Sequence, residues 1–138
     1  ISEMGFDTTV ITDNMVAYTM ENIGIDLFTS ASDTITLDGH VANKVGTHQI
    51  AIVAREFKVP FYITGMPDWE KKTKSDIVIE LRDPSLVLGD HTAKGVKAIY
   101  PSFDITPPEL ISGFVTDKGI YKPRDLKKYL ETDYKSYY

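Results

Sequence analysis

One aspartate and a polar pair downstream of it are the part of this sequence best suited to chemistry. Asp33 directly follows the segment 25–32, which begins with the largely apolar IDLF, and the segment VANK places Asn43 and Lys44 ten and eleven residues further on. A carboxylate at a strand end can transfer protons, and the preceding run would give it an apolar setting in which it holds its proton more tightly. Such an aspartate could equally form a turn or cap a helix. Spacing alone leaves both roles open.

Asn43 and Lys44 could bind an anion. The apolar positions of 41–58 fit one face of a long helix, which places both residues in its first turns. Unpaired backbone N–H groups at a helix start favour an anion, and Lys44 would add a full positive charge. An exposed lysine beside a capping asparagine is an equally good interpretation.

The motifs of the common cofactor sites are absent from the sequence. It contains no GxxxxGK[ST], no GxGxxG and no GxSxG. The three histidines (His40, His48 and His91) are not spaced as metal ligands, and there is no cysteine. We therefore expect no metal and no nucleotide cofactor. Asp104, in the segment FDITPPEL, either caps a short helix that starts at the following prolines or lies near a ligand.

The elements that would position these residues alternate between strands and helices. Turn-bounded, β-branched runs predict strands at 8–13, 25–32, 60–65, 76–81, 96–103 and 111–117. Periodicity and caps predict helices at 13–24, 41–58, 106–112 and 122–134. Nearly continuous apolar strands are typical of a sheet covered on both faces. The order predicts a Rossmann-like, doubly wound α/β fold with a mostly parallel sheet flanked by helices, and ligands at the strands' carboxyl ends.

Composition narrows the classes of protein. The chain has 138 residues, 42% of them apolar, and a net charge of −5, which fits one globular domain and argues against a general nucleic-acid binder. No apolar run approaches the ~20 residues that span a bilayer. We expect a cytoplasmic protein without a membrane partner. The polar run 66–76 is predicted to be a loop, with a flap over the site as the alternative.

Two blocks, SDTITLDGHVANKVGT and YPSFDITPPELI, resemble the family of 5-methylthioribose-1-phosphate isomerases. That family also includes ribose-1,5-bisphosphate isomerases and the regulatory subunits of the initiation factor 2B exchange factor. The resemblance implies that residues 1–138 form the C-terminal Rossmann-like catalytic domain of a longer protein, whose helical N-terminal domain is absent from this chain. It also implies that Asp33 is catalytic, that Asn43 and Lys44 bind substrate, and that no cofactor is needed.

The resemblance favours the isomerases because the exchange-factor subunits usually do not retain the aspartate and the Asn-Lys pair together. It implies conversion of 5-methylthioribose 1-phosphate to 5-methylthioribulose 1-phosphate, in methionine salvage, by general acid/base catalysis. A ribose-1,5-bisphosphate isomerase, or a non-catalytic subunit that binds a phosphate metabolite, is the alternative. A homodimer through this domain is implied as well.

The sequence departs from the isomerase pattern in two ways. Thr34 stands where the isomerases carry an arginine after the aspartate. The family's catalytic cysteine, together with a glutamine and the phosphate-binding arginines, would lie upstream of this chain or on a separate chain. We therefore expect a piece of a larger enzyme, with a relative that lacks the full site as the alternative.

Overall fold

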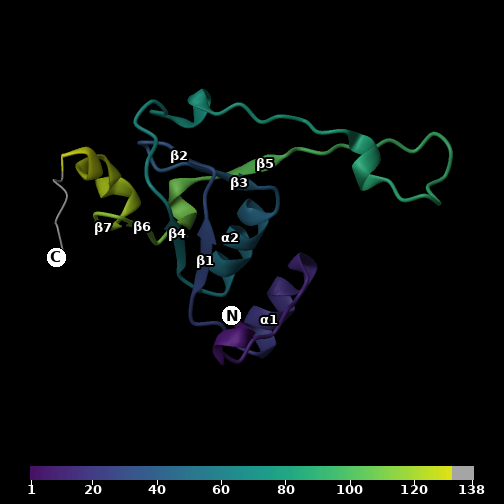
Figure 1. The fold of residues 1–138 in the computed structure, drawn as a ribbon, viewed down its shortest axis with the longest axis horizontal. Helices are drawn as coiled ribbons and strands as arrows, with labels where there is room; N and C mark the ends of the chain where they lie inside the picture. Colours follow the sequence, from purple (N-terminus) through teal and green to yellow (C-terminus); the bar gives the residue numbers. More distant parts are fainter. Residues whose placement is uncertain (132–138) are drawn as a thin grey trace.

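A four-stranded sheet organises the fold in a computed structural model that describes residues 1–131 (Figure 1). Its spatial order is β1 (Phe28–Ala31), β4 (Phe61–Thr64), β6 (Gly113–Thr116) and β7 (Gly119–Tyr121). The first three strands run parallel, and β7 pairs antiparallel with β6 at the edge. Helix α2 (Thr47–Glu56) connects toward β4 and packs on it, and α1 (Val16–Asn22) packs on α2. The predicted α/β class with a mostly parallel sheet is confirmed.

A second, antiparallel sheet was not predicted. It contains β2 (Thr34–Ile35), β3 (Val41–Lys44) and β5 (Phe103–Thr106), with β3 in the centre. The prediction of a helix from residue 41 was therefore wrong at its start. Gly46 has φ 108°, a left-handed conformation that other residues rarely adopt, and the helix begins only at Thr47.

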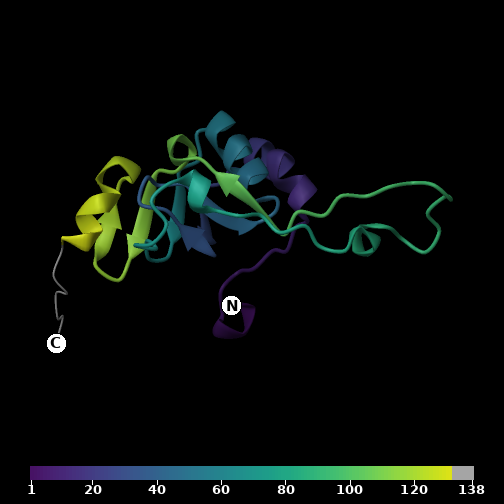
Figure 2. The same ribbon diagram turned by 90° about the horizontal axis from the view of Figure 1, so that it is seen from above.

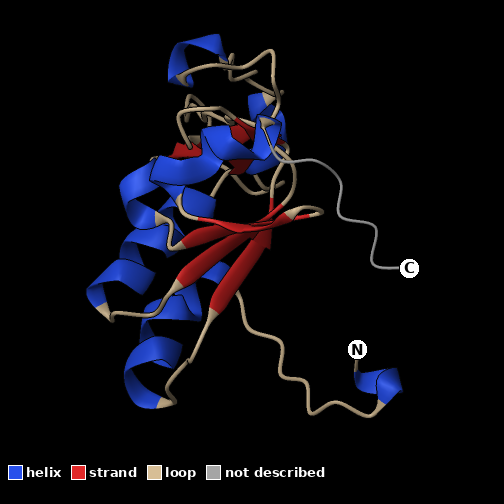
Figure 3. Cartoon of the chain, turned by 90° about the vertical axis from the view of Figure 1, so that its left-hand side faces the viewer, coloured by secondary structure: helices blue, strands red, loops and turns tan. Residues whose placement is uncertain are grey.

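The helices α1 and α2 cover one face of the four-stranded sheet (Figure 3). Large apolar residues of the strands, such as Phe61, Ile63 and Phe114, point into this covered face and are buried. The alternate residues Thr64 and Val115 are exposed. Along β4 the burial therefore alternates between buried and more exposed positions, as the pleat of a strand requires.

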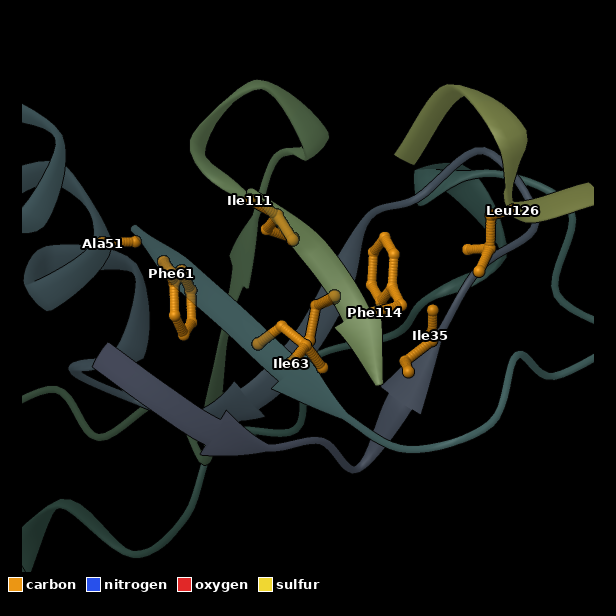
Figure 4. Close-up of a cluster of buried hydrophobic side chains, with 8 residues drawn as sticks. Ile35, Ala51, Phe61, Ile63, Ile111, Phe114 and Leu126 are labelled. Carbon is orange, nitrogen blue, oxygen red and sulfur yellow. The ribbon is translucent and has the colours of Figure 1, made fainter. Parts of the chain in front are cut away.

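The main core lies between this sheet, α2 and the last helical segment (Figure 4). Its members are Ile35, Val41, Ala51, Phe61, Ile63, Ile111, Phe114 and Leu126. Phe28 stacks on Phe61 with ring centroids 4.2 Å apart, which ties β1 to β4. A smaller cluster of Met20, Ala54 and Val59 holds α1 against α2.

Three predicted strands do not form. Residues 8–13 are exposed and unpaired with any strand of the described chain, although β-branched residues favour strands. Residues 77–102 project as an arm between β4 and β5 (Figures 1 and 2), and they include most of the predicted strands 76–81 and 96–103. At the base of the arm, Leu81 bridges Pro101, and the N–H groups of Arg82 and Ser102 donate to the Tyr100 and Glu80 carbonyls, but these contacts do not extend into a strand. A strand needs a ladder partner as well as propensity.

The remaining helical segments are short or narrow. They are 3₁₀ helices at Ser2–Met4, Asp13–Met15, Lys74–Asp76, Pro84–Val87, Pro108–Leu110 and Pro123–Leu130. The predicted helix 13–24 is confirmed as a 3₁₀ turn that leads into α1, and the prolines open a 3₁₀ turn rather than a longer helix. The last segment buries Leu126 and Tyr129, and positions 132–134 of the predicted helix lie outside the described residues. Leu130 is half exposed.

Candidate functional site

Asp33 lies in the short connection between β1 and β2. Its backbone N–H donates to the carbonyl oxygen of Ala42 at 3.0 Å. Thr34 pairs with Ala42 in the antiparallel ladder, so Thr34 and Asp33 both lie against Ala42, the residue that precedes Asn43 on β3. The side chain of Asp33 is exposed. The expected apolar setting is therefore not provided by residues 1–131, although the backbone brings this carboxylate to the strand that carries the polar pair.

Asn43 and Lys44 lie on β3, at its end, and not in a helix. Consecutive residues of a strand face opposite sides, so the two side chains leave β3 in different directions and contact different neighbours. The Asn43 amide nitrogen lies 2.8 Å from Ser30 Oγ and 3.1 Å from Thr47 Oγ1. Lys44 is exposed, and its ammonium lies 5.1 Å from the centre of the Phe103 ring, its cross-strand neighbour.

The start of α2 is already occupied by a carboxylate of this chain. Asp104 accepts hydrogen bonds from the backbone N–H of Gly46 at 2.7 Å and of His48 at 3.1 and 3.2 Å. The expectation that these N–H groups could receive a ligand anion is wrong, because an internal anion fills the positive helix end. Asp104 does cap a helix, but the helix is α2 and not the one predicted after it.

The sequence offers no signal for this cap. Asp104 lies on β5 directly opposite Asn43, and its partner His48 is 56 residues away along the chain. Local capping rules look for an acceptor within a few residues of the helix start. The pairing of β3 with β5 is what places the carboxylate there. Asn43 and Asp104 therefore lie opposite each other on β3 and β5, and Asp33 bonds to Ala42, the neighbour of Asn43.

The turn that joins β2 to β3 fixes this register. The buried Thr36 hydroxyl donates to the Asp38 carboxylate, and the His40 ring nitrogen Nδ1 lies 3.0 Å from the same carboxylate. Burial by itself raises the pKa of Asp38. The hydrogen bonds from Thr36 and His40, with the charge of His40, outweigh burial and hold that pKa below its ordinary value of 3.8. An ionised Asp38 thus stabilises the hairpin that carries Asp33.

The polar run 66–76 is a loop, as predicted, and it is tied to the hairpin. The N–H groups of Leu37 and Asp38 donate to the carbonyls of Lys71 and Lys72, and Asp68 donates to Ile35. The bonds hold the loop beside β2. Trp69 remains two-thirds exposed, at 68%. Nothing in this arrangement supports the alternative of a flap closed over Asp33.

The carboxyl ends of β1 and β4 approach closely at Gly65. A side chain at this position would lie 2.4 Å from Ser32 Oγ, and Gly65 has φ 153°. The Ser32 hydroxyl in turn donates to the Thr64 carbonyl at 3.4 Å. The glycine therefore leaves room for Ser32 at the edge where ligands of α/β sheets bind.

Residues 1–131 contain no group of three or more side chains that could hold a metal ion. Each helix of this part of the chain falls short of the length and apolarity that a bilayer crossing requires. A cavity of about 210 Å³ lies among Ile11, Val16, Met20, Leu27 and their neighbours, but its lining is almost wholly apolar and offers no group for chemistry.

Comparison with known proteins gives one family. Residues 1–123 match the profile of the initiation factor 2 subunit family. A methylthioribose-1-phosphate isomerase of Bacillus cytotoxicus is 42% identical over 127 residues, which cover 87% of this chain and 36% of that protein. A 5-deoxyribose 1-phosphate isomerase of Clostridium botulinum is 45% identical over 139 residues, which cover 94% of this chain and 40% of that protein.

Solved structures agree with these relatives. The crystal structure of 5-methylthioribose 1-phosphate isomerase from Pyrococcus horikoshii matches with a TM-score of 0.85 and 35% identity, over 96% of this chain and 40% of that one. Subunit delta of the translation initiation factor eIF-2B from A. fulgidus matches with a TM-score of 0.82 and 33% identity, over 95% and 41%. The chain spans about two fifths of the length of these relatives.

Proposed function

The chain belongs to the initiation factor 2 subunit family, and from that premise we propose that the protein is an aldose–ketose isomerase acting on a sugar 1-phosphate. Relatives named as isomerases of methylthioribose 1-phosphate and 5-deoxyribose 1-phosphate, at 42% and 45% identity, support the reaction class. Within it we propose conversion of 5-methylthioribose 1-phosphate to 5-methylthioribulose 1-phosphate. 5-Deoxyribose 1-phosphate and ribose 1,5-bisphosphate are the alternative substrates.

The chemistry requires a group that moves protons. The phosphate on the anomeric oxygen blocks simple ring opening, so a proton must reach the ring oxygen as its bond to C1 breaks. Hydrogen then moves from C2 to C1, as a proton or as a hydride, and the C2 hydroxyl gives up its proton as C2 becomes the ketone carbon, which balances the proton gained by the ring oxygen. Substrate and product are isomers, so the reaction consumes no external oxidant or reductant. General acid/base assistance of such steps typically contributes ~10²–10⁴-fold.

Asp33 is the proton-transferring group in this proposal, and Asn43 and Lys44 bind the substrate. The observation that carries the proposal is the hydrogen bond of Asp33 to Ala42, which holds Asp33 beside the β3 residue before Asn43 and next to the carboxyl end of β1, where α/β sheets bind ligands. Thr34 brings no charge to this position. Because position 34 is neutral, the cationic residue closest to Asp33 along the chain is Lys44.

The side chain of Asp33 is exposed, so an apolar setting for it would have to come from another part of the protein. We propose that this chain is the C-terminal catalytic domain of a longer protein, and that a helical N-terminal domain, on the same or a separate chain, lies over Asp33. The length of the relatives, of which this chain covers about two fifths, supports the proposal. An intact-mass measurement of the native protein distinguishes a longer chain or an associated second chain from a lone 15.5 kDa species.

The test of the function is the replacement Asp33→Asn in the intact protein. The amide keeps the size of the side chain but cannot transfer protons, so we expect turnover of 5-methylthioribose 1-phosphate to fall by ~10²-fold or more. Product formation can be followed by ³¹P NMR. The matched control is Asp26→Asn, at another exposed aspartate. Near-normal turnover in Asp33→Asn would remove this carboxylate from the mechanism.

A second candidate function is supported by the eIF-2B subunit delta structure, whose fold matches almost as well as that of the isomerase. In that case the protein binds a phosphate metabolite and turns none over. Calorimetry with 5-methylthioribose 1-phosphate separates the two, because binding without product would favour the regulatory role. We also propose a homodimer through this domain, which light scattering tests.

A further inference from the structure

The side-chain amide of Asn43 joins three elements at the candidate site. Its nitrogen lies within hydrogen-bond distance of two hydroxyl groups, Ser30 Oγ at 2.8 Å and Thr47 Oγ1 at 3.1 Å. Ser30 belongs to β1, Asn43 to β3, and Thr47 is the first residue of α2. Thr47 is buried, and Ser30 and Asn43 are half-buried. A side chain held at two points in this way has little freedom to rotate.

The two hydroxyl groups also decide which end of the amide faces them. A hydroxyl has a single hydrogen to donate. Thr47 Oγ1 donates it to the Lys44 carbonyl at 2.8 Å, and Ser30 Oγ donates it to the Ala31 carbonyl at 3.0 Å. Both oxygens are then left only with lone pairs toward Asn43. The facing group must be a donor, so it is the NH₂ and not the carbonyl of the amide.

We propose that Ser30 and Thr47 are positioning residues that lock the polarity of the Asn43 amide, with its NH₂ inward and its Oδ1 presented as a hydrogen-bond acceptor. Both N–H groups of the amide are used, and Oδ1 has no partner among residues 1–131. An acceptor pairs with a hydroxyl group and repels a phosphate oxygen, which can only accept in its ionised form. Position 43 therefore selects the sugar part of a ligand.

The consequence for the ligand rests on the proposed function, since it takes the ligand to be a sugar phosphate. Asn43 would then accept from a ring hydroxyl, and the phosphate must be bound elsewhere. The N–H groups of Gly46 and His48 at the start of α2 are not free to bind it, because Asp104 already accepts from both. Of the site residues described, Lys44 remains as the phosphate donor. The site thus divides hydroxyl and phosphate recognition between neighbours on one strand.

The lock can be tested in the ligand-free protein. Solvent exchange of the Asn43 side-chain protons, measured by ¹⁵N NMR on the intact protein, is expected to be slow. Ser30→Ala or Thr47→Val removes one acceptor, and the exchange should accelerate about two- to tenfold for each, the effect of one hydrogen bond. Thr47→Ser restores the hydroxyl and should restore slow exchange. The control is Thr29→Val, which changes an exposed position of β1, the strand that carries Ser30. If the native amide exchanges as fast as in Thr47→Val, the lock does not exist.

The ligand consequence is tested by calorimetry with 5-methylthioribose 1-phosphate and with inorganic phosphate. Thr47→Val and Ser30→Ala should weaken binding of the sugar phosphate about two- to tenfold and leave inorganic phosphate unchanged. An analogue that lacks the contacted ring hydroxyl should bind to either variant as tightly as it binds to the native protein. An equal loss for inorganic phosphate would overturn the assignment of Asn43 to a hydroxyl. Slow exchange without any sugar-phosphate binding would instead overturn the proposed function and leave the lock standing.

Discussion

Removal of the Asp104 carboxylate should destabilise the fold at the start of α2. The substitution Asp104→Ala leaves the N–H groups of Gly46 and His48 without their acceptor. A hydrogen bond to a charged group is worth ~1.5–3 kcal/mol. Because two N–H groups lose their acceptor, the free energy of unfolding can fall by at most about twice that amount. Gly46, His48 and Asp104 are all half-exposed, so water replaces part of the loss, and the helix-cap scale of ~0.5–2 kcal/mol is the better guide. We expect a loss of about 2 kcal/mol.

Urea unfolding of the intact protein, followed by circular dichroism, measures this loss as a lower midpoint with an unchanged slope. Asp104→Asn keeps one acceptor oxygen but loses the charge that the helix end favours, so it should cost ~0.3–1 kcal/mol, less than the alanine variant. Asp26→Ala, at an exposed aspartate, is the control and should stay within about 0.5 kcal/mol of the native protein. If Asp104→Ala cannot be distinguished from that control, the carboxylate does not hold the helix start, and the argument that it excludes a ligand anion fails with it.

Two further predictions concern the elements around the site. The lowered pKa of Asp38 means that its ionised form adds stability above its ordinary pKa of 3.8, and that this stability is lost as the pH falls through the lower folded value. Asp38→Asn should therefore flatten the acid limb of the unfolding free energy below about pH 4, and an unchanged limb in pH-dependent urea titrations would contradict this. Gly46→Ala places a side chain at φ 108° and should cost about 1–2 kcal/mol by the same unfolding assay, whereas Gly89→Ala, at a glycine without positive φ and with open space around it, should cost much less.

The parallel strands and α1 could be predicted from the sequence because their signals are local. A β-branched run between turn residues and an apolar stripe with a cap each lie within about ten residues, and the structure confirms them at β1, β4, β6 and α1. The same local reasoning failed for residues 41–44, which fit the helical spacing of α2 but form strand β3. It failed again for 8–13 and 76–81, where strand-forming residues found no ladder partner in the described chain.

The sequence by itself therefore determined the class of fold, the family, and the residues worth testing, namely Asp33, Asn43 and Lys44. Only the tertiary structure decided how these residues are used. The pairing of β3 with β5 places Asp104 on the start of α2, and the meeting of β1, β3 and α2 fixes the Asn43 amide between two hydroxyl groups. Contacts between residues so far apart in the chain leave no periodic trace in a sequence, because they depend on which strands become neighbours.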